Sequence, residues 1–162
     1  MNILLLSIKN IKMKKFSIAI VLSSMSALSL GQKIDYNFQK GYIAGGYDVV
    51  SYFNNEATKG KSNIIFNYEN AKFKFSSQSN LDKFKANPSK YTPQYGGWCA
   101  YALATKNEKV TINPETFEIR NGKLYLFYNK FFENTLESWL EEMPNKLVQT
   151  ANINWSKIKY VN

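Results

Sequence analysis

Apolar and polar side chains alternate along residues 64–75, a period of two that is typical of β-strands. The polar pair Glu69-Asn70 interrupts this alternation, so the stretch is predicted to form a β-hairpin that turns there. On the second strand, two phenylalanines alternate with Lys72 and Lys74. We interpret the phenylalanines as a buried face and the two lysines as the solvated face.

The same pattern predicts a second hairpin later in the chain. Residues 117–120 and 123–128 are rich in strand-forming side chains, and Asn121-Gly122 lies between them. These two residues adopt positive φ angles more readily than most, as a two-residue type I′ hairpin turn requires. Residues 47–53 are predicted to be a further, short β-rich segment.

Apolar residues spaced three and four apart predict several short helices. These helices are expected just after Ser76–Ser79, at residues 98–104, at residues 132–143 and within residues 145–161. The serines are suited to cap the first helix, which Pro88 ends, and Pro144 ends the third. Met143 is expected to pack in the core from the apolar face of the third helix. The predicted fold class is α+β, a small single domain of two antiparallel β-hairpins packed with short helices.

Residues 1–31 have the pattern of a secretory signal peptide. We take Met13 as the true start of the chain. The lysines that follow it precede about 15 mostly apolar residues, and cleavage is expected after Gly31. A membrane anchor is the alternative, but it needs roughly 20 apolar residues. The mature chain, residues 32–162, is predicted to be exported to the periplasm or the medium, without a stable membrane span. It is expected to be one domain without internal repeats, with a core at about residues 41–155.

Composition then excludes several classes of site. The chain has 162 residues, no histidine and one cysteine, so it cannot form a Ser-His-Asp triad, a histidine metal site, a CxxC pair or an intrachain disulfide. After signal removal, 17 basic and 12 acidic side chains remain, a modest and dispersed charge of +5. An exported protein with this charge is not expected to bind nucleic acid. The sequence offers no pair of side chains that would act as general acid and base, so it is not predicted to be an enzyme.

Four stretches together resemble a known family. They are Gly46-Tyr47-Asp48-Val49-Val50-Ser51-Tyr52-Phe53; Phe75-Ser76-Ser77 with Asn80, Phe84, Asn87-Pro88 and Tyr91; Pro93-Gln94-Tyr95-Gly96-Gly97-Trp98-Cys99-Ala100-Tyr101-Ala102; and Asn121-Gly122-Lys123-Leu124-Tyr125-Leu126-Phe127-Tyr128-Asn129. This combination resembles the YHS domain family in its exported bacterial form, over roughly residues 41–155.

The resemblance implies a metal site with copper as the candidate. In copper-transporting ATPases and some oxygenases, YHS domains carry two cysteines four residues apart, and soft thiolates favour Cu(I). The corresponding positions here are Ser76 and Asn80, which are hard, neutral ligands. Cys99 and Met143 are the remaining soft donors of the mature chain, and Cys99 is the metal candidate.

Cys99 and the residues around the two Gly-Gly pairs are the candidate ligand-binding residues. Cys99 is interpreted as a buried small apolar residue, with a ligand, metal or redox role and an intermolecular disulfide as alternatives. Tyr47 and Asp48 could form the polar end of a pocket, or Asp48 could cap a turn. Three further aromatic candidates could line a pocket beside Cys99 or belong to the core; they are Tyr95, Trp98 and Tyr101.

Three functions remain open at this stage. The first is an exported, non-enzymatic accessory module that binds an unknown small ligand or a metal. The second is a structural or protein-interaction domain of the cell envelope without bound metal, docking a partner protein through exposed aromatic side chains. The third is a redox enzyme that uses Cys99 with a thiol from another molecule.

Overall fold

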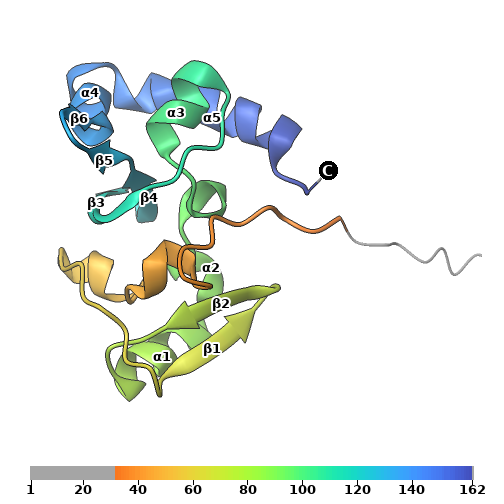
Figure 1. The fold of residues 1–162 in the computed structure, drawn as a ribbon, viewed down its shortest axis with the longest axis vertical. Helices are drawn as coiled ribbons and strands as arrows, with labels where there is room; N and C mark the ends of the chain where they lie inside the picture. The colour runs from red at the N-terminus through yellow and green to blue at the C-terminus, as the bar shows by residue number, and fades with distance from the viewer. Residues whose placement is uncertain (1–31, 162) are drawn as a thin grey trace, which may run out of the picture. The chain divides into compact units, whose positions relative to one another are not determined.

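The computed structural model describes residues 32–161, and the predicted signal peptide lies outside the described residues (Figure 1). The described residues form an α+β unit with three antiparallel strand pairs, β1-β2, β3-β4 and β5-β6. This confirms the predicted fold class. Within residues 32–161, no helix combines the length and the apolar character that crossing a membrane requires.

The first half of the unit contains the first predicted hairpin. Its elements are the 3-10 helices η1 (Ile43–Gly46) and η2 (Ser51–Asn54), strands β1 (Ile65–Tyr68) and β2 (Ala71–Lys74), and helices α1 (Gln78–Ala86) and α2 (Pro88–Tyr91). Glu69 and Asn70 both have positive φ, as the turn prediction requires. The side chain of Ser77 accepts a hydrogen bond from the Asn80 amide, which confirms the predicted serine cap.

The second half contains the second hairpin. Its elements are η3 (Gln94–Gly97), α3 (Ala100–Lys106), β3 (Asn113–Arg120), β4 (Lys123–Phe127), β5 (Asn129–Lys130), β6 (Glu133–Asn134), α4 (Thr135–Glu141) and α5 (Pro144–Ile158). Asn121 and Gly122 both have positive φ at the predicted turn. The small β5-β6 pair was not predicted, because two-residue strands leave no measurable alternation in the sequence.

The two halves share much of their order of elements, a similarity of structure and not of sequence. In η1, Ala44, Gly45 and Gly46 have φ of 50°, 61° and 83°; in η3, Tyr95, Gly96 and Gly97 have 56°, 61° and 83°. Each left-handed turn is followed by a short helix, a hairpin with a two-residue turn, a capped helix and a helix that begins with proline, and the second half has the β5-β6 pair in addition. The sequence hides the repeat because the two halves share few residue identities beyond the Gly-Gly pairs.

The buried side chains form two clusters, and the first of them also takes in residues of the second half, such as Cys99, Leu124 and Leu126. In the first, α1 covers the β1-β2 hairpin, and the ring of Phe84 lies at the centre of four other aromatic rings, those of Phe66, Tyr68, Phe73 and Phe75. Phe73 and Phe75 are buried, as predicted. In the second, the buried Trp139 of α4 packs against Tyr125 and Phe127 of β4.

Residues 47–53 are not a strand, contrary to the prediction. Tyr47 forms one isolated bridge with Lys59, and η2 begins at Ser51. The side-chain Oδ1 of Asp48 accepts a hydrogen bond from the Val50 amide at 2.9 Å. This local bond stabilises a turn, and it outweighs the strand preference of the two valines in this segment.

The predicted helix at 132–143 is shorter, and its apolar face is partly exposed. Asn134 caps α4, so the helix begins only at Thr135 and leaves Phe132 in the preceding turn, fully exposed. Met143 does not pack in the core, since it is 65% exposed and lies at the start of α5. The regular spacing of apolar residues runs on past both ends of α4. Periodicity alone therefore cannot locate these helix ends.

The packed unit extends beyond the expected core of residues 41–155. Ile34 and Tyr160 form an antiparallel bridge, and the Asp35 amide donates to the carbonyl of Lys159 at 2.8 Å. The indole Nε1 of Trp98 donates to the carbonyl of Asp35, also at 2.8 Å. The two ends of the described chain therefore lie side by side.

Candidate functional site

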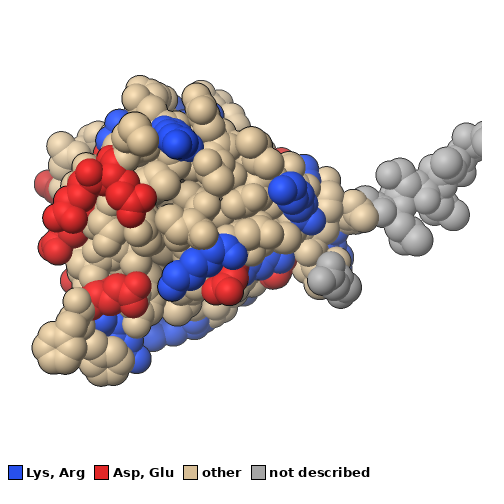
Figure 2. Space-filling view, turned by 90° about the horizontal axis from the view of Figure 1, so that it is seen from above, with Lys and Arg blue, Asp and Glu red and all other residues tan. Residues whose placement is uncertain are grey.

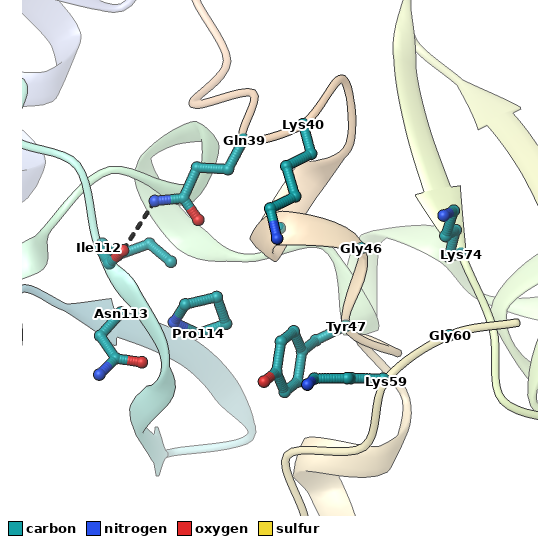
Figure 3. A pocket seen from close by; sticks show the side chains of 11 residues that line it. Gln39, Lys40, Gly46, Tyr47, Lys59, Gly60, Lys74, Ile112, Asn113 and Pro114 are labelled. Carbon is teal, nitrogen blue, oxygen red and sulfur yellow. Dashed lines mark hydrogen bonds between the residues drawn. The ribbon is translucent and has the colours of Figure 1, made fainter. Parts of the chain in front are cut away.

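A cavity of about 730 Å³ opens between η1 and the first residues of β3 (Figure 3). Six lining residues matter for its chemistry; they are Gln39, Lys40, Tyr47, Lys59, Lys74 and Pro114. They come from segments far apart in the sequence. The volume lies in the range of about 300–1,000 Å³ that is typical of small-molecule sites.

The left-handed turn of η1 shapes one wall of the cavity. Positive φ at Gly45 and Gly46 costs a glycine little, and a Cβ at Gly45 would lie only 3.1 Å from the ring of Pro114. The carbonyl of Gly46 accepts a hydrogen bond from the Gly60 amide at 2.9 Å. This bond holds the loop that carries Lys59 beside η1.

Gln39 joins this wall to the opposite one. Its Nε2 donates to the carbonyl of Ile112 at 2.7 Å (Figure 3) and to the hydroxyl of Thr111 at 2.6 Å. The loop before η1 is therefore fastened to the chain that enters β3. Lys40, the next residue, extends toward the space above Gly46.

Three lysines and no carboxylate line the cavity. In the described range 32–161, the side-chain ion pairs are Lys109–Asp35 and Arg120–Glu118, and neither involves a lining residue. The ammonium of Lys59 lies 5.9 Å from the centroid of the Tyr47 ring. The lining therefore carries three positive charges and no negative one, with the carboxylate of Glu115 just outside it on Tyr47.

Tyr47 is the one predicted ligand-binding residue that lines this cavity. Its hydroxyl donates to Glu115 Oε1 at 2.7 Å, and this hydrogen bond is the main reason why the pKa of Tyr47 is raised. Desolvation and the negative charge of Glu115 act in the same direction. Tyr47 therefore presents a neutral phenol and a ring face.

Asp48 points away from the cavity, into a buried hydrogen-bond cluster. Its carboxylate is fully buried. Oδ2 accepts from the Ser76 amide at 2.8 Å, the Ser76 hydroxyl at 2.6 Å and Asn80 Nδ2 at 2.8 Å. Together with the bond from Val50, Asp48 thus ties η2 to the start of α1.

This cluster occupies the two positions at which the YHS resemblance implies metal-binding thiols. The hydroxyl of Ser76 and the amide nitrogen of Asn80 both face the carboxylate as donors, so they offer no soft lone pair to Cu(I). Among residues 32–161, no three His, Cys, Asp or Glu side chains gather where they could hold a metal ion. The residues present do not fit a copper site.

Cys99 occupies the place in the second half that Asp48 has in the first, two residues after a Gly-Gly pair. It is fully buried, with Sγ 3.4 Å from both the Tyr128 amide and the Thr135 hydroxyl. Like Ser76, Tyr128 follows the hairpin of its half. Cys99 and Tyr101 border a separate cavity of about 250 Å³, so the thiol is not part of the lysine-lined site.

Of the three aromatic candidates, Tyr101 lines the cavity beside Cys99, whereas Tyr95 and Trp98 do not. Tyr95 is buried, and its hydroxyl donates to Asn152 Oδ1 at 3.0 Å; burial raises its pKa. Trp98 donates to the backbone of Asp35, and the hydroxyl of Tyr101 donates to Glu142 at 2.6 Å, which raises the pKa of Tyr101. Their hydrogen bonds fix them to different parts of the structure.

No family model, curated protein or solved structure matches this chain.

Gly60 is expected to be essential for the shape of the cavity wall. A Cβ at this position would lie 2.4 Å from Lys74 Cβ and 2.7 Å from the Lys74 carbonyl carbon, so the backbones must separate in Gly60→Ala. We expect the free energy of unfolding to fall by about 1–3 kcal/mol, the usual cost of overpacking. Urea denaturation measures this change. Ser62→Ala, an exposed change in the same loop, should alter it by less than about 0.5 kcal/mol; equal effects of the two would contradict the prediction.

Proposed function

We propose that this chain is an exported, non-enzymatic accessory module of the YHS type that binds a small ligand in the lysine-lined cavity. The observation that carries the proposal is the cavity itself, built from η1, the Lys59 loop, β2 and the entry to β3. Concave sites with a few converging polar groups are the usual places for small ligands. The buried cluster of Asp48 keeps η2, which follows this wall, in place.

The lining residues favour binding over catalysis. The chain has no histidine. Glu115 accepts a hydrogen bond from the hydroxyl of the lining residue Tyr47. Lysine ammoniums and a neutral phenol can hold a ligand and orient it by donating hydrogen bonds, and the lining contains no histidine or carboxylate to act as a general base. Metal chemistry has no part in the proposal, because the Ser76 and Asn80 positions do not fit copper.

The proposal is tested by an NMR titration. The ¹⁵N-labelled protein, residues 32–162, is titrated with a library of uncharged and charged fragments. We expect amide shifts at Gly45, Gly46 and Gly60, which line the cavity, because a bound ligand changes their surroundings. Gly122, in the distant hairpin turn, is the internal control and should not move. The proposal would be contradicted if every shift fell outside the cavity, or if no fragment shifted any amide.

A second function, a protein-interaction domain of the cell envelope, is favoured by one observation. Phe131 and Phe132 form the turn between β5 and β6 and are 84% and 107% exposed. Phe131 also has a φ of 58°, a conformation that is rare for a bulky side chain. Two adjacent aromatic rings in water are typical of a docking site. If this function holds, Phe131 and Phe132 are needed for binding and the cavity residues are not.

A further inference from the structure

We infer that the ligand of the cavity is a small organic polyanion, a carbon skeleton that carries two or more carboxylate or phosphate groups. This inference rests on the proposed function and names its ligand class. It follows from the placement of three lysines around one cavity that also has apolar walls.

The lysines approach the cavity from separate segments. Lys40 precedes η1, Lys59 lies in the loop that pairs with Tyr47, and Lys74 ends β2 (Figure 3). Three separate segments thus supply one ammonium group each to the lining. A ligand with two or more separated negative groups can contact more of these ammonium groups at once than a single small anion can, and each charge-assisted contact adds to its affinity.

The charge of these lysines is available to a ligand. The two ion pairs found among residues 32–161 lie elsewhere, and no carboxylate lines the cavity. On the face shown in Figure 2, the acidic side chains gather mostly toward one side of the unit, apart from several of the basic ones. Like charges held together without counter-charges repel one another, and a bound anion relieves that repulsion.

Two of the three lysines are positioned by packing. The stem of Lys74 lies against Gly46, where a Cβ would be 3.3 Å from Lys74 Cδ, and its ammonium is 4.1 Å from the centroid of the Tyr42 ring. The ammonium of Lys59 lies beside the Tyr47 ring. Side chains that are already placed lose less conformational entropy when they bind a ligand.

The size and the walls of the cavity indicate an organic anion and not a bare inorganic ion. About 730 Å³ is the volume of a site for a drug-sized molecule. The ring of Tyr47 and the pyrrolidine of Pro114 face this space and offer apolar contact to a carbon skeleton (Figure 3). Glu115, hydrogen-bonded to Tyr47, is the acidic group that would repel such a ligand.

The test uses citrate and pyrophosphate as probes for carboxylate and phosphate groups, with glucose as the neutral comparison. Each is titrated into the ¹⁵N-labelled protein at low ionic strength, with amide shifts and calorimetry as readouts. We expect citrate, pyrophosphate or both to shift the amides of Gly45, Gly46 and Gly60. Affinity should fall as the ionic strength rises from about 0.01 to 0.15 M, since the screening length falls from about 30 to 8 Å.

Charge variants test the assignment of the lysines. Lys40→Gln with Lys59→Gln should weaken binding of the polyanion roughly tenfold, whereas Lys123→Gln, an exposed lysine outside the cavity, should change it less than about twofold. Glu115→Gln should strengthen binding roughly two- to fivefold, because it removes the repelling charge. An unchanged spectrum outside the cavity shows that each variant is folded.

The outcomes separate this inference from the proposed function. If neutral fragments shift the cavity amides but citrate and pyrophosphate do not, the polyanion inference is wrong and the proposed function stands. If a polyanion binds with an affinity that the lysine pair does not affect, the inference is also wrong. If no fragment and no anion shifts the cavity amides, both fail.

Discussion

Asp48→Ala should lower the free energy of unfolding by about 3–5 kcal/mol, because it leaves one buried and three part-buried donors without their acceptor. The carboxylate accepts from the amides of Val50 and Ser76, from the Ser76 hydroxyl and from Asn80 Nδ2, all within 2.9 Å. Each buried donor that loses its partner costs about 1–3 kcal/mol, and some of these groups will recover a partner in water.

Urea denaturation of Asp48→Ala and of Asp82→Ala measures this effect. Asp82 is the matched control, since it is exposed on α1 and accepts a bond only from the nearby side chain of Gln78 among the described contacts. Its removal should change the free energy of unfolding by less than about 0.5 kcal/mol. A double-mutant cycle with Ser76→Ala should show a coupling above about 0.5 kcal/mol. Equal effects of the two aspartate changes would show that the buried cluster contributes no stability.

Phe84→Ala should lower the free energy of unfolding by about 3–5 kcal/mol, as expected for removing a buried aromatic ring. Phe84 is fully buried, and its ring centroid lies 4.8 Å from that of Phe73 and 5.1 Å from that of Phe75. The change leaves a cavity between α1 and the first hairpin. Little can move in to fill it, because the neighbouring rings are fixed on strands.

Phe132→Ala is the same chemical change at a fully exposed position and serves as the control. It should shift the free energy of unfolding by less than about 0.5 kcal/mol. Denaturant curves of the two variants, fitted with a common slope, give the comparison. A cost at Phe132 close to that at Phe84 would mean that the β5-β6 turn is packed and not open to solvent.

The hairpins could be predicted from the sequence because their signals are local. Asn121-Gly122 determines its own turn, and the alternation of Phe73 with lysines determines which face of β2 is buried. The helix after Ser77 is equally local, since its cap and its end are set by neighbouring residues. The α+β class follows from these elements alone.

Elements governed by a few side-chain bonds could not be predicted. The bond from Val50 to Asp48 turns a valine-rich segment away from strand geometry, and the cap of Asn134 moves the start of α4 past Phe132. Periodicity measures spacing along the chain and carries no information on where one element stops and another starts. The internal repeat was hidden for a related reason, because it is a repeat of backbone geometry.

The candidate site could be predicted only in part. Tyr47 was a candidate from its place after the Gly-Gly pair, and it lines the cavity. Lys74 was interpreted as a solvated strand residue, and Lys40 and Lys59 carry no motif at all. These lysines gather through tertiary structure, which no local pattern encodes. Asp48 and Cys99, which the sequence brought to notice, instead hold the fold together from within.

The repeated order of elements bears on how such a chain arises. Two halves with matching left-handed turns, hairpins and capped helices form the pattern that duplication and fusion of one ancestral gene segment would leave. Two residues after its Gly-Gly pair, one half has the carboxylate of Asp48 and the other has the thiol of Cys99, each with donors that suit it. The lysine-lined cavity borders only the first of the two turns, so the matching backbone of the two halves does not extend to their surfaces.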